Sequence, residues 1–208
     1  MPLTEEYRKQ LRAVHSGRSV ERPWGTTGER NAGMVLVEIL SGRSDVHTVL
    51  DFGSGQGSLG ALVNTMLPRL VWSNYDPGIP GIDTLPDQQF DFIVSSDVME
   101  HVEPELVAAT ITWMRLHARK GMFHHIACDP CGLILPDGRN AHLTCREPSW
   151  WRSMFENPEW SLMYYADCIQ RKRGTLRRHC QLQLDHTGVP VVTTTKARYT
   201  EADAALAA

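Results

Sequence analysis

Short apolar runs rich in β-branched and aromatic residues alternate with longer segments whose apolar positions repeat at helical spacing. The short runs end in glycine, proline or aspartate, which is typical of buried parallel strands. The longer segments resemble the N-terminal one, where Leu3, Tyr7, Leu11 and Val14 share one face of a helix. The pattern predicts strands at 47–53, 69–76, 90–97, 120–128, 160–169 and 175–185. It predicts helices at 4–16, 29–40, 58–67, 104–118 and 147–155.

The regular alternation of strand and helix predicts the fold class. Strand–helix–strand units with buried strands form parallel sheets that are covered by helices. We therefore expect an α/β fold, with a doubly wound, mostly parallel sheet and helices on both faces. The 208 residues are enough for one such domain with a full core and too few for two ordinary domains.

Composition excludes several classes of protein. With 42% hydrophobic and 22% charged residues, the chain has the balance of a globular protein, and no apolar run approaches the ~20 residues that span a bilayer. The first residues lack the basic and then apolar order of a secretory signal, so we expect a cytoplasmic protein without a membrane partner. A formal net charge of −3 argues against a protein that coats nucleic acid. The five cysteines are expected to be free thiols in a reducing cytosol.

The segment GSGQGSLG, residues 53–60, places glycines between a predicted strand and a predicted helix. Gly53, Gly55 and Gly57 form a G-x-G-x-G pattern, whereas Gly55, Gly57 and Gly60 fit the G-x-G-x-x-G of dinucleotide-binding turns. Ligands of parallel sheets bind beyond the carboxyl ends of the strands, and glycine lets backbone amides approach a ligand there. A ligand-binding turn and a plain tight turn both fit this pattern.

Two acids beside the turn narrow the choice of ligand. Asp51 precedes Gly53 at the strand end, where its carboxylate would repel the pyrophosphate of a dinucleotide and attract an ammonium group. Asp76 ends the next strand, where an acid can accept hydrogen bonds from both hydroxyls of a ribose. The strand 90–97 then runs into further polar residues. Together these features favour a ligand that carries both a ribose and an ammonium group.

Three segments in this order, VLDFGSGQGSLG, NYDPGIPG and FDFIVSSDVMEHVEPE, resemble the class I S-adenosylmethionine-dependent methyltransferases. That family has a D-x-G-x-G-x-G turn, a ribose-binding acid at the end of the second strand and an F-D-x-V…E-H segment on the fourth. The resemblance covers about residues 45–130 and implies a seven-stranded type of sheet. Because Asp83 follows Asp76 after only seven residues, the third strand region is expected to be shortened.

The resemblance implies S-adenosyl-L-methionine as the cofactor and the G-x-G-x-G interpretation of the turn. The cofactor-binding residues that it implies are Asp51, Gly53, Gly55, Gly57, Asp76, Pro77, Asp83 and Ser96. It divides the single domain 1–208 into a helical segment 1–42, a cofactor-binding core 45–130, a substrate loop and helix 128–155, a closing strand pair 159–186 and a tail 187–208. The segment LPDGRNAHLTCREPSWW, with its PDGRNAH loop, is similar to one in a bacterial and phage-type subgroup of the family.

Polar residues after the strand 90–97 lie where this family brings the acceptor and the methyl group together. A carboxylate or imidazole there could take a proton from an acceptor hydroxyl or amine. We therefore predict Asp97, His101 and His142 as catalytic residues. The alternative is that Glu100 and His101 cap and pack the next helix.

The pair Cys128-x-x-Cys131, followed by His142-x-x-Cys145, has the ligand types and spacing of a tetrahedral zinc site. The same stretch lies where the family carries its substrate loop, and such spacings often occur without a metal. We expect a substrate loop there and no bound metal.

Candidate substrate-binding residues lie in the loop 135–151 and in the closing hairpin. Arg139 could bind a phosphate or carboxylate through two hydrogen bonds, and one of the adjacent Trp150 and Trp151 could stack on a base while the other belongs to the core. The basic hairpin would either steer an anionic acceptor to the ligand-binding edge or form a solvated surface. The predicted substrate-binding residues are His125, Arg139, Asn140, Trp150, Arg171 and Arg173.

These residues together predict methyl transfer to an oxygen or nitrogen of a small polar acceptor, an anionic nucleotide or sugar derivative. A nucleic-acid base or ribose methyltransferase is the first alternative, although the chain shows no long basic arm that would follow a duplex. A non-catalytic cofactor-binding partner or regulatory subunit is the second. A nicotinamide oxidoreductase is the third, and Asp51 disfavours it.

Overall fold

The structure is a computed structural model that describes residues 3–16, 25, 28–172 and 175–187. The predicted substrate residue Arg173 and almost all of the predicted tail lie outside the described residues. Side chains are described for the same ranges, except at residues 170–172 and 175. The predicted substrate residue Arg171 is therefore placed by its backbone alone.

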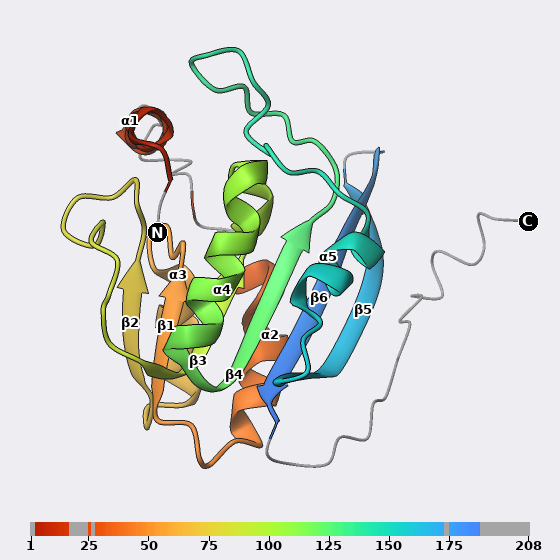
Figure 1. Cartoon of the computed structure of the whole chain (residues 1–208). Coiled ribbons are helices and arrows are strands. Elements are labelled where there is room, and N and C mark those ends of the chain that lie inside the picture. Colours follow the sequence, from red (N-terminus) through yellow and green to blue (C-terminus); the bar gives the residue numbers. More distant parts are fainter. Residues whose placement is uncertain (1–2, 17–24, 26–27, 173–174, 188–208) are drawn as a thin grey trace, which may run out of the picture.

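A six-stranded sheet forms the centre of the described structure, with the strand order β2-β1-β3-β4-β6-β5 (Figure 1). Its strands are β1 Thr48–Phe52, β2 Val71–Tyr75, β3 Phe90–Ser96, β4 Ala118–Ala127, β5 Trp160–Lys172 and β6 Thr175–His186. The first four strands in the sheet order run parallel, and β6 runs antiparallel between β4 and β5. Because β5 therefore runs in the same direction as β4, its end lies at the carboxyl edge of the parallel strands.

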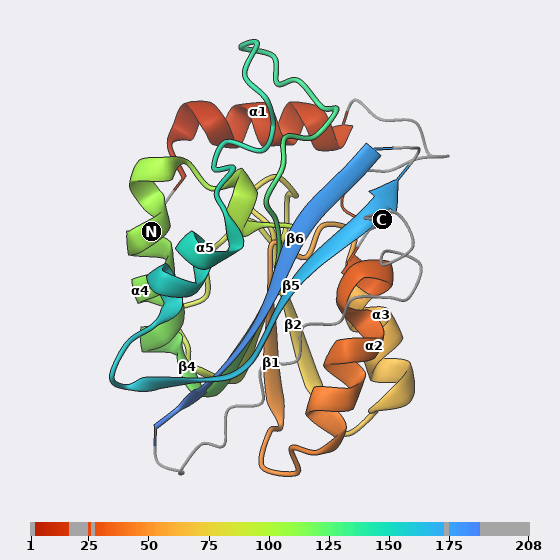
Figure 2. The same cartoon turned by 90° about the vertical axis from the view of Figure 1, so that its right-hand side faces the viewer.

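Helices cover both faces of this sheet (Figure 2). Helices α2 and α3 lie on one face, α4 and α5 lie on the other, and α1 lies across the carboxyl edge of the parallel strands. They are α1 Glu5–Ser16, α2 Gly28–Ser41, α3 Ser58–Met66, α4 Val107–His117 and α5 Pro148–Phe155, with 3₁₀ turns at Met99–His101 and Pro104–Leu106. None of the helices in the described ranges is long and apolar enough to cross a membrane.

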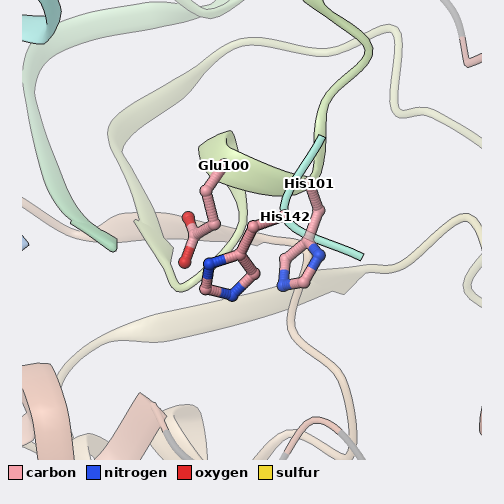
Figure 3. Close-up of side chains that lie close together, drawn as sticks. All are labelled: Glu100, His101 and His142. Atoms are coloured by element: carbon pink, nitrogen blue, oxygen red, sulfur yellow. The ribbon is translucent and has the colours of Figure 1, made fainter. Parts of the chain in front are cut away.

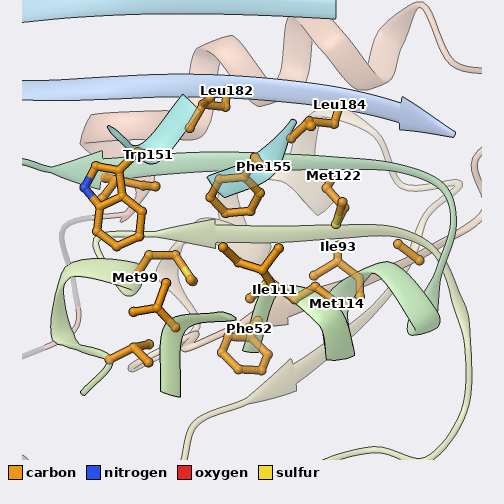
Figure 4. Packing of buried hydrophobic residues seen from close by; sticks show 14 of the residues in the cluster. Phe52, Ile93, Met99, Ile111, Met114, Met122, Trp151, Phe155, Leu182 and Leu184 are labelled. Atoms are coloured by element: carbon orange, nitrogen blue, oxygen red, sulfur yellow. The ribbon is translucent and has the colours of Figure 1, made fainter. Parts of the chain in front are cut away.

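Two apolar cores fill the space between the helices and the sheet. Trp151 and Phe155 of α5 are fully buried in the core that α4 and α5 cover (Figure 4). Strand β3 serves both cores, because Ile93 belongs to this one whereas Phe92 and Val94 belong to the core under α2 and α3. Burial on both faces is the reason that the sequence of β3 is almost continuously apolar.

The loop that follows β4, residues 128–147, packs against α1 through a smaller apolar cluster. Tyr7 and Leu11 of the helix contact the buried Leu135 and Ala141 of the loop. The helix and the loop together cover the carboxyl edge of the parallel strands (Figure 2). This is the edge at which the sequence predicts a ligand.

The structure confirms the predicted fold class, and each predicted strand and helix is present with small shifts at its ends. It corrects one detail, because a 3₁₀ turn at Pro104–Leu106 precedes α4 and divides the predicted helix 104–118. The expected shortening of the third strand region is confirmed, since the sheet has six described strands and the segment 77–89 forms turns and bends. Its prolines lack the N–H group that a strand ladder needs.

Candidate functional site

The glycine turn follows β1 at the carboxyl edge of the sheet and leads into α3. Gly53, Gly55 and Gly57 have positive φ angles of 79°, 53° and 75°. Glycine adopts this conformation at little cost. Gly60 lies inside α3 instead, where any side chain would collide with Trp72. The turn therefore follows the G-x-G-x-G interpretation, and Gly60 is required for packing of the helix.

A segment that precedes α2 lies against this turn. The amide of Gln56 donates a hydrogen bond to the carbonyl oxygen of Gly25 at 3.0 Å. A Cβ atom at Gly55 would overlap the backbone of Gly25, and one at Gly53 would lie 2.5 Å from the side chain of Val98. Two of the three glycines are thus required by close packing within the protein itself.

Asp76 joins the end of β2 to the glycine turn. Its Oδ2 accepts a hydrogen bond from the Gly55 amide at 2.9 Å, and its Oδ1 accepts one from the Gly78 amide at 2.8 Å. His15, in the last turn of α1, places its Nε2 3.5 Å from the same Oδ1. Burial lowers the pKa of His15, although the Asp76 charge opposes this effect. The predicted ribose-binding acid is therefore buried, fixed by backbone amides and covered by α1.

Asp51, on β1, is buried. Its Oδ2 makes no hydrogen bond of good geometry among the described residues, although the indole of Trp72 approaches the carboxylate and opposes the rise of its pKa. Burial and the charge of Asp76 raise the pKa of Asp51 to about 7. The hydroxyl oxygens of Ser54 and Ser96 are also buried without a partner in the described ranges. A ligand, ion or water can satisfy such atoms, although others in the described ranges, such as Nε1 of Trp151, belong to the apolar core.

The other predicted cofactor residues lie at the same edge of the sheet. Ser96 is the last residue of β3, and Pro77 follows Asp76 in a buried turn. Asp83 lies farther along the segment between β2 and β3 and forms an ion pair with Arg12 of α1 at 2.7 Å. The hydrogen bond from Arg12 holds the pKa of Asp83 below its usual value. Asp83 thus contacts α1, which also covers Asp76.

Asp97 directly follows β3 and has a positive φ angle of 57°, which is uncommon for a residue with a side chain. Its Oδ2 accepts a hydrogen bond from Nδ2 of Asn31 at 2.6 Å, and its Oδ1 lies 3.1 Å from Nδ1 of His125 on β4. The His179 ring of β6 lies against the His125 ring, with 4.6 Å between their centroids. Asp97, His125 and His179 thus form a polar cluster across β3, β4 and β6.

Glu100 and His101, in the 3₁₀ turn after β3, meet His142 from the loop after β4 (Figure 3). One potential metal-binding atom of each residue lies within 4.8 Å of those of the other two. Nδ1 of His101 donates a hydrogen bond to the Ala141 carbonyl oxygen at 2.6 Å. Nδ1 of His142 donates one to the Asp129 carbonyl oxygen, also at 2.6 Å. The structure thus brings together two of the three predicted catalytic residues and adds Glu100.

Burial and neighbouring charges shift the pKa values in this cluster. Burial and the charge of Asp97 raise the pKa of Glu100 to about 8, whereas burial and the charge of His142 lower the pKa of His101 to about 4. Burial also lowers the pKa of His142, but a hydrogen bond with Cys131 and the charge of Glu100 outweigh it and raise the pKa to about 9. Burial raises the pKa of the Cys131 thiol, but its contact with His142 outweighs this and lowers the pKa to about 7.

The four residues that fit the spacing of a zinc site do not form a common cluster. A hydrogen bond between the thiols of Cys128 and Cys180 raises the pKa of Cys180, so Cys128 is engaged with β6. Cys145 Sγ donates to the His142 carbonyl oxygen at 3.5 Å, whereas Cys131 contacts the His142 ring. Among the described residues, one group of three potential ligands lies within reach of a single ion, and it is the group in Figure 3.

Two predicted substrate residues of the loop are engaged within the loop itself. Asn140 Oδ1 accepts hydrogen bonds from the amides of Cys131 at 3.2 Å and His142 at 2.9 Å. Arg139 forms an ion pair with Asp137 at 2.7 Å and keeps 46% of its side chain exposed. Asn140 therefore stabilises the loop conformation, while Arg139 is in contact with solvent.

The remaining predicted substrate residues lie near the closing strands. Trp150 is partly buried, with the guanidinium carbon of Arg146 5.5 Å from the centroid of its ring, whereas Trp151 is fully buried. This confirms that one tryptophan of the pair belongs to the core. Arg171 lies near the end of β5, at the carboxyl edge of the parallel strands. Arg173 is outside the described residues.

Sequence patterns do not identify two residues that the structure places in the site, His15 and Asn31. Both lie on helices that precede the glycine turn, and they reach Asp76 and Asp97 through tertiary packing. Neither belongs to a motif, and a polar residue on an exposed helix face has no distinguishing signal in a single sequence. The C-terminal turn of α1 is therefore part of the site.

No protein-family model and no curated protein matches the chain. Similar solved structures include magnesium protoporphyrin IX methyltransferase (ChlM) from Synechocystis with bound SAH, at 14% identity and a TM-score of 0.59, covering 88% of this chain and 95% of that one. A 1,6-didemethyltoxoflavin-N1-methyltransferase from Burkholderia thailandensis, with bound S-adenosylhomocysteine, is 15% identical with a TM-score of 0.59, covering 90% and 92%. TehB from Haemophilus influenzae is 16% identical with a TM-score of 0.54, and the match covers 74% of this chain and 62% of TehB.

These likenesses extend over most of the chain, although the identities are low. Two of the three proteins are named as methyltransferases, and both were solved with the demethylated form of S-adenosylmethionine. At such identities a structural match establishes the fold. The protein therefore has the class I methyltransferase fold, with the glycine turn at the carboxyl edge of its sheet.

Proposed function

We propose that this protein is a methyltransferase that transfers a methyl group from S-adenosyl-L-methionine to an oxygen or nitrogen of a small polar acceptor, an anionic nucleotide or sugar derivative. The observation that carries this proposal is the position of the buried carboxylate of Asp51 beside the glycine turn that Asp76 fixes. A carboxylate at this place repels a pyrophosphate and attracts an ammonium group. S-adenosylmethionine carries an ammonium group and a ribose and has no phosphate.

The residues at the carboxyl edge suit this cofactor. Asp76 accepts hydrogen bonds from the amides of Gly55 and Gly78, and Nε2 of His15 lies 3.5 Å from its Oδ1. A carboxylate offers about four acceptor positions, so Oδ2 can also accept from a ribose hydroxyl, and Oδ1 can do so where a hydroxyl takes the place of His15. Asp51 would hold the ammonium group. Ser96 offers a buried hydroxyl without a described partner, and the turn from Pro77 to Asp83 would line the adenosine side.

The cofactor, when bound, supplies a methyl group already activated on a sulfonium, so alignment of the acceptor provides most of the catalysis. The acceptor loses a proton as it gains the methyl group. Asp97 holds Nδ1–H of His125 toward its Oδ1, which leaves the lone pair of the ring on Nε2. We propose that the imidazole of His125 accepts this proton and that the carboxylate of Asp97 orients the ring, as a carboxylate beside a basic imidazole commonly does.

The acceptor class is proposed from charge. Arg139 and the basic end of β5 would flank the entrance and attract an anion. We also propose that the protein belongs to the bacterial and phage-type subgroup of methyltransferases that its PDGRNAH loop resembles. We place the activity in the cytoplasm, where the five cysteines, which are free thiols in the structure, would stay reduced.

Two measurements test this function. Calorimetry should detect one-to-one binding of S-adenosylmethionine and S-adenosylhomocysteine, with weaker or absent binding of a nicotinamide dinucleotide. A labelled methyl donor should then be offered to nucleotides, sugar phosphates and neutral analogues, with transfer RNA and single-stranded DNA as competing acceptors. Asp97→Asn should bind the cofactor as the natural protein does and transfer methyl groups more slowly.

The outcomes separate the proposal from its alternatives. Preferred binding of a nicotinamide dinucleotide would overturn the choice of cofactor. Cofactor binding without transfer to any acceptor would indicate a partner or regulatory subunit. Transfer confined to polynucleotides would show a nucleic-acid methyltransferase.

A further inference from the structure

Three side chains with metal-binding atoms converge at the carboxyl edge of β3, beside the proposed acceptor site. Glu100 and His101 belong to the 3₁₀ turn after β3, and His142 belongs to the loop after β4 (Figure 3). Their nearest ligand atoms lie within 4.8 Å of one another. Two imidazoles and one carboxylate form a ligand set that zinc and other divalent transition metals commonly accept.

Both imidazoles are held in the orientation that a metal ligand requires. Nδ1–H of His101 points to the Ala141 carbonyl oxygen, and Nδ1–H of His142 points to the Asp129 carbonyl oxygen, each at 2.6 Å. With its proton fixed on Nδ1, the ring of His101 has its lone pair on Nε2. The ring of His142 also hydrogen-bonds the Cys131 thiol, which raises the pKa of His142 to about 9, so an ion that binds its Nε2 must displace a proton. Histidines that bind metals almost always donate the other ring N–H to a carbonyl, a carboxylate or water in this way.

One carboxylate oxygen of Glu100 accepts a hydrogen bond from the backbone, and the other does not. Oε1 accepts a hydrogen bond from the Ala127 amide at 3.2 Å, whereas Oε2 is buried without a hydrogen-bond partner in the described ranges. A buried carboxylate oxygen without a partner is costly, and a cation would offset that cost. The Thr144 amide donates to the Glu100 carbonyl oxygen at 2.9 Å, so the loop of His142 is tied to the turn of Glu100.

We propose that Glu100, His101 and His142 bind one divalent transition-metal ion, such as Zn²⁺, Fe²⁺, Mn²⁺ or Co²⁺. Metal–ligand bonds of about 2.0–2.2 Å place tetrahedral ligand atoms roughly 3.3–3.6 Å apart, so rotations that move each side chain by about 1 Å would close the group around an ion. Three protein ligands leave at least one coordination position open, as in catalytic metal sites. If the proposed methyl transfer is correct, that position would hold an oxygen of the acceptor.

This site differs from the one that the cysteine spacing suggests. The two ligand sets share His142, and the proposed site does not include Cys128, Cys131 or Cys145. A cobalt complex separates the two sets, because thiolate ligands add a strong charge-transfer absorption in the near ultraviolet and nitrogen and oxygen ligands do not. The test therefore reads out which atoms bind the ion as well as whether one binds.

The experiment uses the full chain, prepared without a metal-binding tag and freed of metal with a chelator. Co²⁺ and Zn²⁺ are titrated in the absence of S-adenosylmethionine, with calorimetry and visible absorption as readouts. We expect one ion per chain and a cobalt spectrum without thiolate absorption. His142→Ala and Glu100→Gln should weaken binding at least about tenfold, while the exposed His47→Ala and the cysteine variant Cys128→Ser should bind as the natural protein does.

Failure of the metal site and failure of the proposed function are distinguishable. Cofactor binding is measured separately, with chelator present, and does not depend on the metal titration. The metal proposal is overturned by the absence of a one-to-one complex, by thiolate absorption lost in Cys128→Ser, or by full affinity in folded His142→Ala and Glu100→Gln. If either variant unfolds on heating before the natural protein does, the stoichiometry and spectrum of the natural protein decide the question.

Discussion

The carboxylate of Asp76 accepts a hydrogen bond from the backbone amide of Gly55 at 2.9 Å, so the acid that ends β2 is bound to the turn that follows β1. The two strands pair in parallel up to Phe52 and Tyr75, which places the turn and the acid side by side. One carboxylate thus stabilises the glycine turn and faces the proposed ribose site. Its removal should affect both.

We predict that Asp76→Asn weakens the binding of S-adenosylhomocysteine by about 2 kcal/mol or more, the scale for loss of hydrogen bonds to a charged group. An amide oxygen can keep one backbone hydrogen bond, but the variant lacks the second acceptor oxygen that the ribose hydroxyls need. Calorimetry of the folded variant measures the change in affinity. Its unfolding temperature should fall as well, because a buried backbone amide loses a charged acceptor.

Asp87→Asn is the matched control for this prediction. Asp87 lies on the same segment between β2 and β3, but it is exposed, so we expect less than about a threefold change in affinity. A loss in Asp87→Asn as large as that in Asp76→Asn would show that the effect is not specific to the carboxylate at the glycine turn.

The pKa of Asp51 gives a prediction for pH dependence. Burial and Asp76 raise it to about 7, so the folded protein holds this proton more tightly than the unfolded chain does. The contribution of Asp51 to stability is therefore complete below about pH 4 and is lost as the pH rises through 7. At about 1.4 kcal/mol for each pKa unit, the free energy of unfolding should fall by on the order of 2 kcal/mol between pH 5 and 8.

Asp51→Asn provides the control, because an amide does not titrate. Denaturant unfolding at several pH values should show that the natural protein loses stability relative to Asp51→Asn over this range. Binding of a cationic cofactor should show the opposite trend, with affinity rising toward pH 8 in the natural protein, because the charged carboxylate attracts the ammonium group. Parallel pH profiles of the two proteins would assign the titration to another group.

The arrangement of strands and helices could be predicted because each carries its own local pattern. The apolar run of β3 and the glycines after β1 show burial and turn geometry within a few residues. The position of Asp76 could also be predicted, because parallel strands end at one edge. Sequence patterns therefore predict where the glycine turn and Asp76 lie in the fold.

The cluster of Glu100, His101 and His142 could not be predicted in the same way, because its contacts join distant segments. Spacing alone groups Cys128 with His142, whereas Cys128 follows β4 and its free thiol lies against the free thiol of Cys180 on the neighbouring strand. His142 instead reaches Glu100, and the loop conformation that brings it there depends on the hydrogen bonds of Asn140. These relations follow from the path of the loop over the sheet, which has no periodic signal.

Close packing of the glycine turn gives a prediction for stability. Gly55→Ala places a methyl group against the backbone of Gly25 and requires a positive φ angle, so we expect a loss of at least about 2 kcal/mol. Gly138→Ala is the matched control, because Gly138 also has a positive φ angle, of 85°, but nothing lies within 4 Å of its added methyl group. It should lose only about 1 kcal/mol. If Gly55→Ala and Gly138→Ala lose the same free energy of unfolding in chemical denaturation, the backbone of Gly25 does not restrict the space around Gly55.

The last prediction concerns the charge of the acceptor. Arg171 and Lys172 end β5 at the carboxyl edge, whereas Arg119 and Lys120 lie near the start of β4 at the opposite edge. Changing Arg171 and Lys172 to glutamine should raise the apparent KM for an anionic acceptor and leave the affinity for S-adenosylhomocysteine unchanged. The same change at Arg119 and Lys120 removes an equal charge far from the acceptor and should leave the KM unchanged. Because both residues pair with the buried Asp91, the unfolding temperature of this variant is measured first to show that it is folded.

The salt dependence of these variants separates steering from other effects. Exposed charges are screened beyond about 10 Å at ~0.1 M salt, so the defect of the β5 variant should shrink as salt is added. Steady-state kinetics at several salt concentrations measure this, with the β4 variant as reference. Full activity of the β5 variant at low salt would show that the basic residues of the hairpin form a solvated surface and do not attract the acceptor. A steep salt dependence in the natural protein, equivalent to the release of counterions from several phosphates, would instead identify the acceptor as a nucleic acid.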